Sequence, residues 1–340
     1  SVLNTLVDFT NLDFIPDNED IYTLLRGGNS LYTAFGIGPG NDTDAGYALT
    51  PIVEGGFEVV DVVSAAKSGD RAALYALQKL NPFLISGGIA DVRYQQLYDS
   101  GELNAENVSN EYLAARSKFL SLVLERNEND ITGHAVIIER SGEPFAVFTD
   151  VGTGIEIQTF SFSPDAVRYI FGNDQNNTTE LVGGGLGDYL FGRGGQDVLI
   201  GNGGADQLFG GTGNDQITGG TGVDLLSGGQ GADRFYWNTG DEDDVIVDYD
   251  DAGDRILVNN IDLASLKFQR ASTNSPYYID SAHPDITMHY EGDFLTINIG
   301  SGSDAGSITV TQFTPALGQD YGIVLNDYTV APPVTDITVA

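Results

Sequence analysis

The chain contains no cysteine among its 340 residues. A disulfide scaffold, a thiolate metal site and a cysteine nucleophile are therefore excluded. Basic residues are also scarce, because 15 Lys and Arg stand against 49 Asp and Glu, for a formal net charge of −34. Nucleic acids and anionic membranes both attract positive charge, so neither is an expected partner.

Long apolar runs are absent as well. No stretch approaches the roughly 18 apolar residues of a membrane-spanning helix, so we expect no transmembrane segment. The first eight residues lack the basic region of a secretory signal peptide, and export would use another route. The hydrolase motif G-x-S-x-G and the zinc-protease motif H-E-x-x-H are both missing. We therefore expect a protein that is not an enzyme.

The composition changes twice along the chain. At Phe171 it shifts to Gly, Asn and Asp, and at Trp237 it shifts to short alternating strands separated by turn residues. These shifts predict three parts: an α+β domain over 1–170, a glycine-rich repeat domain over 171–236, and a mainly-β region over 237–340.

Helical periodicity covers three segments in the first part of the chain. Apolar residues share one face over 59–66, over 70–80 with Asp70 as N-cap, and over 109–124 with Ser109 as N-cap.

Apolar and polar residues then alternate, which is typical of strands. Residues 134–138 and 144–149 flank a Ser-Gly-Glu turn, which predicts a β-hairpin. In the last part of the chain, the clearest predicted strands are 277–279, 286–290, 294–299 and 307–313.

A repeat of nine residues runs from 183 to 236. In each of six consecutive units, the first residue is Gly, the sixth is Asp and the eighth is apolar. The fourth residue is Gly in five units, with Leu186 as the exception. The unit before them keeps the apolar residue, Leu181, but has Thr179 in place of the Asp.

Nine residues divide into a six-residue turn and a three-residue strand whose apolar side chain points inward. Two units then form one coil, and three coils stack into a roll about 14 Å long at about 4.8 Å per strand. Stacking places Asp188 beside Asp206, and Asp197 beside Asp215. Close like charges repel, and calcium, a hard cation with 6–8 oxygen ligands, would relieve this repulsion.

The repeat resembles the G-G-x-G-x-D-x-apolar-x motif of the RTX ("repeats in toxin") family. This resemblance implies a parallel β-roll that binds about four or five calcium ions between equivalent turns of adjacent coils. The carboxylate ligands that it implies are Asp188, Asp197, Asp206, Asp215, Asp224 and Asp233. The carbonyl ligands that it implies are those of Gly195, Gly204, Gly213, Gly222 and Gly231.

Two features after the repeats fit the same family. Residues 241–258 resemble the segment that closes the open end of many RTX rolls, where Asp248, Asp250 and Asp254 are candidates for one more calcium ion. A solvated acidic turn is the alternative. The last five residues, 336–340, are similar to the uncleaved signal of type I secretion substrates, because an acid precedes mostly apolar residues.

The resemblance implies a secreted calcium-binding protein that folds in external calcium. We expect a non-enzymatic extracellular component, either adhesive or self-assembling and retained at the cell surface, whose partners are calcium and either a second copy or a cell-surface ligand. Two alternatives remain. In the first, the chain is the C-terminal export-and-folding module of a larger, lipase-like RTX hydrolase. In the second, it is an enzyme with an unrecognised site in residues 1–170.

Overall fold

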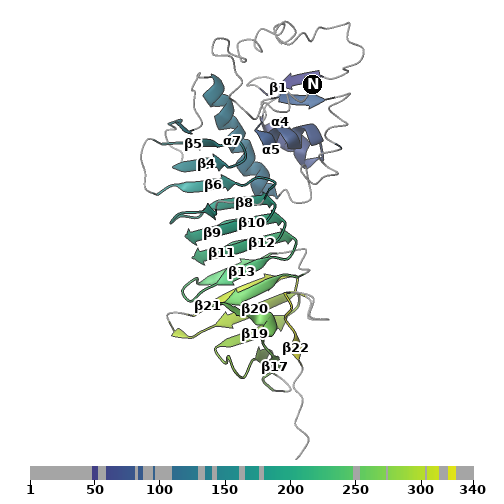
Figure 1. Cartoon of the computed structure of the whole chain (residues 1–340), viewed down its shortest axis with the longest axis vertical. Helices are drawn as coiled ribbons and strands as arrows, with labels where there is room; N and C mark the ends of the chain where they lie inside the picture. The colour runs from purple at the N-terminus through teal and green to yellow at the C-terminus, as the bar shows by residue number, and fades with distance from the viewer. Residues whose placement is uncertain are drawn as a thin grey trace, which may run out of the picture. The chain divides into compact units, whose positions relative to one another are not determined.

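The computed structural model describes residues 48–52, 59–80, 83–86, 95, 109–128, 135–139, 144–160, 165–175, 180–247, 253–272, 275–302, 305–313 and 321–326. The chain divides into two compact units, residues 1–174 and 175–340 (Figure 1). Each unit is described by itself. No helix in the described part of the chain is both long enough and apolar enough to cross a membrane.

The first unit contains the three predicted helices, α4 (Val59–Lys67), α5 (Arg71–Lys79) and α7 (Asn110–Glu128). Both predicted caps are present. The Asp70 carboxylate accepts a hydrogen bond from the Ala73 N–H at 2.9 Å, and the Ser109 hydroxyl accepts one from the Tyr112 N–H at 3.0 Å. These contacts satisfy backbone donors that the first turn of a helix leaves open.

The strands of the first unit pair differently from the prediction. Alongside an antiparallel pair, β1 (Ala48–Pro51) and β2 (Phe83–Ser86), a second sheet contains β3 (Ala135–Ile137), β4 (Ala146–Asp150), β5 (Ile155–Gln158) and β6 (Val167–Phe171). In it, β5 lies between β3 and β4, antiparallel to β4 and parallel to β3, while β6 pairs in parallel with β4. The predicted hairpin between 134–138 and 144–149 is therefore wrong.

A tight turn after β4 explains this pairing. The Asp150 carboxylate accepts hydrogen bonds from the Thr153 N–H at 2.7 Å and from the Thr153 hydroxyl at 2.9 Å. Gly154, with a φ of 70°, returns its N–H to the Asp150 carbonyl. This turn reverses the chain within four residues, so β5 becomes the antiparallel neighbour of β4.

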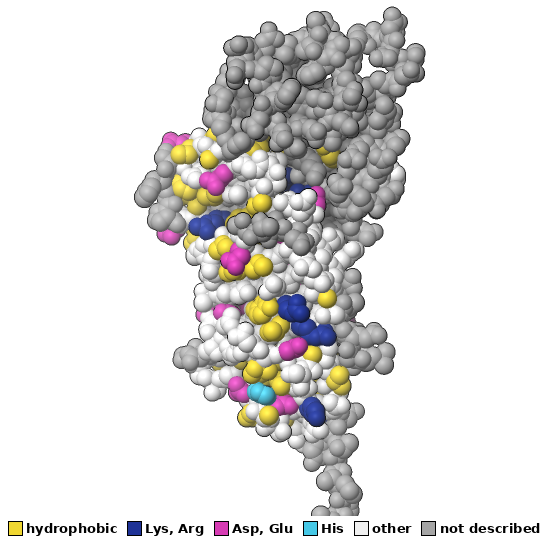
Figure 2. Space-filling view, in the orientation of Figure 1, with side chains coloured by type: hydrophobic (Ala, Val, Ile, Leu, Met, Phe, Trp, Pro, Cys, Tyr) yellow, Lys and Arg dark blue, Asp and Glu magenta, His cyan; other side chains and the backbone are white. Residues whose placement is uncertain are grey.

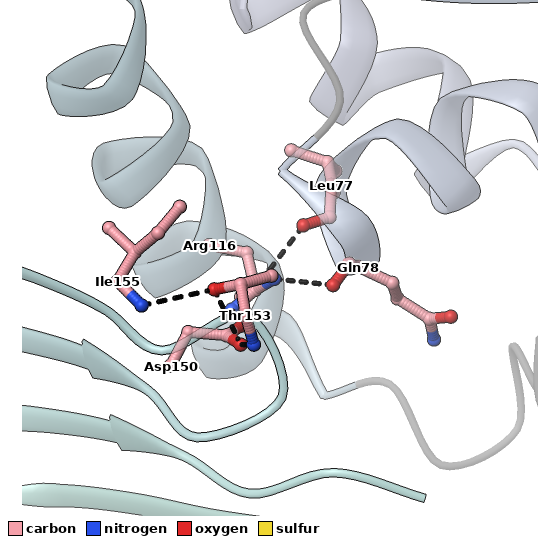
Figure 3. A network of polar contacts seen from close by, with 6 residues as sticks. All are labelled: Leu77, Gln78, Arg116, Asp150, Thr153 and Ile155. Atoms are coloured by element: carbon pink, nitrogen blue, oxygen red, sulfur yellow. Dashed lines mark hydrogen bonds and ion pairs between the residues drawn. The ribbon is translucent and has the colours of Figure 1, made fainter. Parts of the chain in front are cut away.

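A fully buried arginine ties the helices of the first unit to its sheet (Figure 3). Arg116, on α7, donates from Nε to the Leu77 carbonyl at 2.9 Å and from its guanidinium to the Gln78 carbonyl. The same guanidinium pairs with the Asp150 carboxylate and lies 4.6 Å from the centroid of the Phe171 ring. It thereby satisfies open carbonyls at the end of α5 and compensates a buried charge on β4.

The second unit begins as a parallel β-roll with two columns of strands. One column contains β8 (Tyr189–Gly194), β10 (Gln207–Thr212), β12 (Leu225–Gln230) and β14 (Asp243–Ile246). The other contains β7 (Leu181–Val182), β9 (Val198–Gly203), β11 (Gln216–Thr221), β13 (Arg234–Trp237) and β15 (Arg255–Val258). All of these strands pair in parallel.

The register confirms two repeats per coil. Leu208 pairs with Leu190 on one side and with Leu226 on the other, each 18 residues away. The roll is longer than the predicted three coils, because β7, β14 and β15 extend its columns beyond the six repeats. The eighth residue of each repeat points inward as predicted. The fully buried set, with its equivalents at both ends, is Leu181, Leu190, Leu199, Leu208, Ile217, Leu226, Phe235, Ile246 and Ile256.

The rest of the second unit is mainly β, and the four predicted strands are present. Its elements are β16 (Ile261–Asp262), the 3₁₀ turn η3 (Leu263–Ser265), β17 (Phe268–Arg270), β18 (Tyr277–Ile279), β19 (Ile286–Glu291), β20 (Phe294–Ile299), β21 (Gly306–Thr311) and β22 (Leu325–Asn326). Strands β18 to β21 form an antiparallel meander. Strand β21 then pairs in parallel with β14, so this sheet is continuous with one column of the roll.

Candidate metal centre

Six repeat aspartates lie inside the roll, each at the point where a turn enters a strand. All are at most 1% exposed, although carboxylates are seldom fully buried unless they are paired. On the face in Figure 2, acidic side chains are accordingly few and scattered over the roll. The aspartates form two columns: Asp188, Asp206 and Asp224 in one, and Asp197, Asp215 and Asp233 in the other.

Each column is held by the same hydrogen bond from coil to coil. The Asp188 N–H donates to Asp206 Oδ1 at 2.7 Å, and the Asp206 N–H donates to Asp224 Oδ1 at 2.8 Å. The second column repeats the pattern, with Asp197 donating to Asp215 Oδ1 at 2.8 Å. Carboxylates that the spacing predicted to be neighbours are thus stacked within one column.

The second oxygen of the carboxylate is the chemically informative one. In Asp206 and Asp224, Oδ2 is buried and accepts no hydrogen bond from the described residues. A carboxylate oxygen removed from water without a donor or a cation is costly. A calcium ion between adjacent turns would satisfy it, so these residues fit that metal.

The electrostatics of the columns also favour a cation. Burial raises the pKa of Asp206 to about 7, and the neighbouring Asp224 and Asp188 carboxylates raise it further against the backbone hydrogen bond that lowers it. Burial likewise raises the pKa of Asp224 to about 6, with Asp241 and Glu242 adding to the effect. Negative charge is therefore unfavourable here unless a positive ion compensates it.

The glycines of the repeat serve two different purposes. Gly195, Gly204, Gly213, Gly222 and Gly231, at position four, have φ between 98° and 138°, which only glycine adopts readily. The glycines at position one have no positive φ and are needed for space. A Cβ on Gly201 would collide with Asp206 Oδ2 and with the Gly219 carbonyl of the next coil. The close approach of turns, more than turn geometry, requires glycine at position one.

Both aspartate columns continue past the last repeat. The Asp224 N–H donates to Asp244 Oδ1 at 3.1 Å, and the Asp233 N–H donates to Asp254 Oδ1 at 2.7 Å. Asp244 and Asp254 are both buried, and burial raises the pKa of Asp244 to about 8. The predicted Asp254 therefore joins a column, while its two predicted partners, at 248 and 250, lie outside the described residues.

Sequence reasoning missed Asp244, although a signal was present. Asp244 and Asp254 are each followed two residues later by a buried isoleucine, Ile246 and Ile256, as in the repeats. Their distances from the preceding column members are 20 and 21 residues instead of 18, and the longer turns break the nine-residue period.

Backbone oxygens would complete any calcium site in these columns. In the described part of the chain, no three His, Cys, Asp or Glu side chains gather at a point suited to a metal ion. Each pair of stacked turns offers two carboxylates, and calcium takes 6–8 oxygens. Stacked turn carbonyls, such as that of Gly204, which faces Gly222, could supply further oxygens.

Parallel coils of two repeats, with a buried aspartate at every turn, define a calcium-binding β-roll. Residues 182–217 and 209–241 match the family model for the RTX calcium-binding nonapeptide repeat, in four copies. This segment of the chain therefore carries RTX repeats of the calcium-binding type. No curated protein matches the chain in sequence.

Proposed function

We propose that this chain is a secreted, non-enzymatic protein whose roll folds around external calcium and then acts as a rigid structural element. The observation that carries the proposal is the pair of buried aspartate columns, in which Asp206 and Asp224 each hold a buried carboxylate oxygen without a hydrogen bond from the described residues.

Calcium binding and folding of the roll would be one event. The ligands come from turns that are adjacent only after the coils have stacked, so the unfolded chain offers no comparable site. Each site held at ten times its dissociation constant adds about 1.4 kcal/mol, and several sites together decide whether a roll with such a thin core is stable.

The same coupling supports the proposal of secretion. Extracellular calcium modules have dissociation constants of roughly 10⁻⁴–10⁻³ M, a range suited to the millimolar calcium outside cells. Sites of that strength would stay empty in a calcium-poor cytosol, and the repeats would remain unfolded until export. RTX repeats of the kind found here are typical of secreted proteins.

A calcium titration of the purified chain tests this proposal. Far-UV circular dichroism in excess EGTA should show loss of strand signal, and calcium, but not equimolar magnesium, should restore it. Asp206→Asn should raise the calcium midpoint, since it removes a buried carboxylate. Asp262→Asn is the matched control, because that side chain is 42% exposed on β16. A spectrum unchanged by EGTA would overturn the proposal.

We also propose that the folded protein assembles with copies of itself at a surface. The support is β16, the terminal strand of one sheet among the described residues, whose outer edge presents backbone groups able to pair with another chain. Sedimentation velocity with and without calcium tests the idea. Calcium-dependent oligomers are expected, and a monomer at all calcium and protein concentrations would overturn it.

A further inference from the structure

A pair of aspartates at the C-terminal end of the roll lies partly outside the repeats. Asp224 belongs to the fifth repeat, and Asp244 belongs to the non-repeat strand β14. The Asp224 N–H donates to Asp244 Oδ1, which is the contact that stacked repeats make with one another. Asp244 therefore occupies the place of a repeat aspartate without belonging to the motif.

One carboxylate oxygen of this pair, Asp224 Oδ2, still needs a hydrogen-bond donor or a cation. Asp224 uses Oδ1 to accept the Asp206 N–H, while its Oδ2 is buried and accepts no hydrogen bond from the described residues. Asp241 and Glu242 add negative charge around the same carboxylate. A divalent cation between Asp224 and Asp244 would satisfy the oxygen and offset the charge.

The strand that carries Asp244 also holds the C-terminal sheet. Strand β14 pairs with β12 of the roll on one side and with β21 on the other. The Ser307 N–H donates to the Glu242 carbonyl at 3.2 Å, and the Ser307 hydroxyl donates to Asp243 Oδ1 at 2.8 Å. Contacts that position the meander thus pass through residues 242–246.

The only tryptophan of the chain lies at this junction. Trp237 is buried, and its Nε1 donates to the Glu242 carbonyl at 3.1 Å. Its ring packs against β21, because a Cβ on Gly306 would lie 2.6 Å from Trp237 Cζ2. Trp237 lies on β13 of the roll and against β21, so its fluorescence responds to the docking of β21 in addition to the folding of its own coil.

From these contacts we infer that Asp224 and Asp244 bind a terminal calcium ion, and that this ion couples the repeats to the C-terminal sheet. The inference rests on the proposed calcium-dependent folding of the roll. The ion orders β14, and the ordered β14 gives β21 its parallel partner, so the meander docks only when the terminal site is filled.

Asp244→Asn, with Asp243→Asn as its matched control, tests this coupling in the full chain. Both variants remove one carboxylate from β14, but Asp243 is exposed and its asparagine keeps an oxygen for the Ser307 hydroxyl. Isothermal titration calorimetry with calcium chloride counts the ions. Trp237 fluorescence follows docking, and far-UV circular dichroism follows the repeats.

The expected result is selective. Asp244→Asn should bind one calcium ion fewer, and its Trp237 transition should move to at least about tenfold higher calcium, while the repeat transition by circular dichroism changes far less. Limited proteolysis at the calcium concentration that folds the repeats should then cleave the variant within residues 253–326. Asp243→Asn should match the unmodified chain in all three readouts.

Different outcomes separate this inference from the proposed function. Equal stoichiometry and an equal Trp237 midpoint in Asp244→Asn and the unmodified chain would overturn the terminal site, even though the repeats still respond to calcium. An equal shift in both variants would also overturn it, since the effect would then be one of net charge. An unmodified chain that does not respond to calcium would instead overturn the proposed function.

Discussion

Replacement of Ile217 by alanine should raise the calcium concentration that the roll needs in order to fold. Ile217 is fully buried on β11, between Leu199 of the preceding coil and Phe235 of the following one. Truncation of such a side chain costs about 3 kcal/mol, because the transfer free energy is lost and a cavity remains.

Calcium binding can offset that loss of stability. The number of ions that bind on folding determines how far the free calcium concentration must rise to do so. Each saturating site adds about 1.4 kcal/mol for every tenfold rise in free calcium. Four coupled sites would therefore compensate Ile217→Ala with about a three- to fourfold rise in the folding midpoint, and two sites would require about a tenfold rise. The size of the shift thus reports how many ions fold with the roll.

The assay is circular dichroism in calibrated calcium buffers, with Gln216→Ala as the matched control. Gln216 is the neighbouring residue on the same strand, but its side chain points outward and is exposed. The control should shift the midpoint by less than twofold, since exposed substitutions usually change stability by about 0.5 kcal/mol or less. Equal shifts in the two variants would refute the inward assignment of the eighth repeat position.

Three further outcomes follow from the structure. Gly201→Ala should prevent the roll from folding at millimolar calcium, whereas Gly185→Ala, whose Cβ meets nothing within 4 Å, should fold normally by circular dichroism. The raised pKa values of Asp206 and Asp224, about 7 and 6 against an ordinary 3.8, mean that the folded roll binds more protons than the unfolded chain; in EGTA the strand signal should therefore increase as the pH falls from about 7 to about 4, and a decrease would contradict this. Arg116→Met should lower the stability of the first unit by about 3–5 kcal/mol in chemical denaturation, because it leaves a buried carboxylate without its partner; a loss below about 1 kcal/mol would count against that role.

The repeat region was predictable because its period is strict. A nine-residue repeat fixes which side chain points inward, so the buried position of Leu208 and the stacking of Asp188 on Asp206 follow from spacing alone. The places of Asp244 and Asp254 in the aspartate columns were harder to predict, because the turns before them are longer than nine-residue spacing allows. Only the three-dimensional contacts show that the columns continue to these two residues.

The pairing of strands in the first unit shows a different limit. Alternation located β3 and β4 correctly, but alternation does not say which strand pairs with which. The deciding feature was the turn built by Asp150 and Thr153, which makes β5 the partner of β4. Arg116 was equally hidden, since its carbonyl and carboxylate partners are 34 or more residues away in the sequence.

Anomalous scattering from crystals grown in calcium tests the central claim most directly. The account predicts anomalous peaks along both aspartate columns, between stacked turns, including one beside Asp206 and one between Asp224 and Asp244. Crystals that diffract well, show the folded roll and contain no anomalous peak beside Asp206 or Asp224 would contradict it.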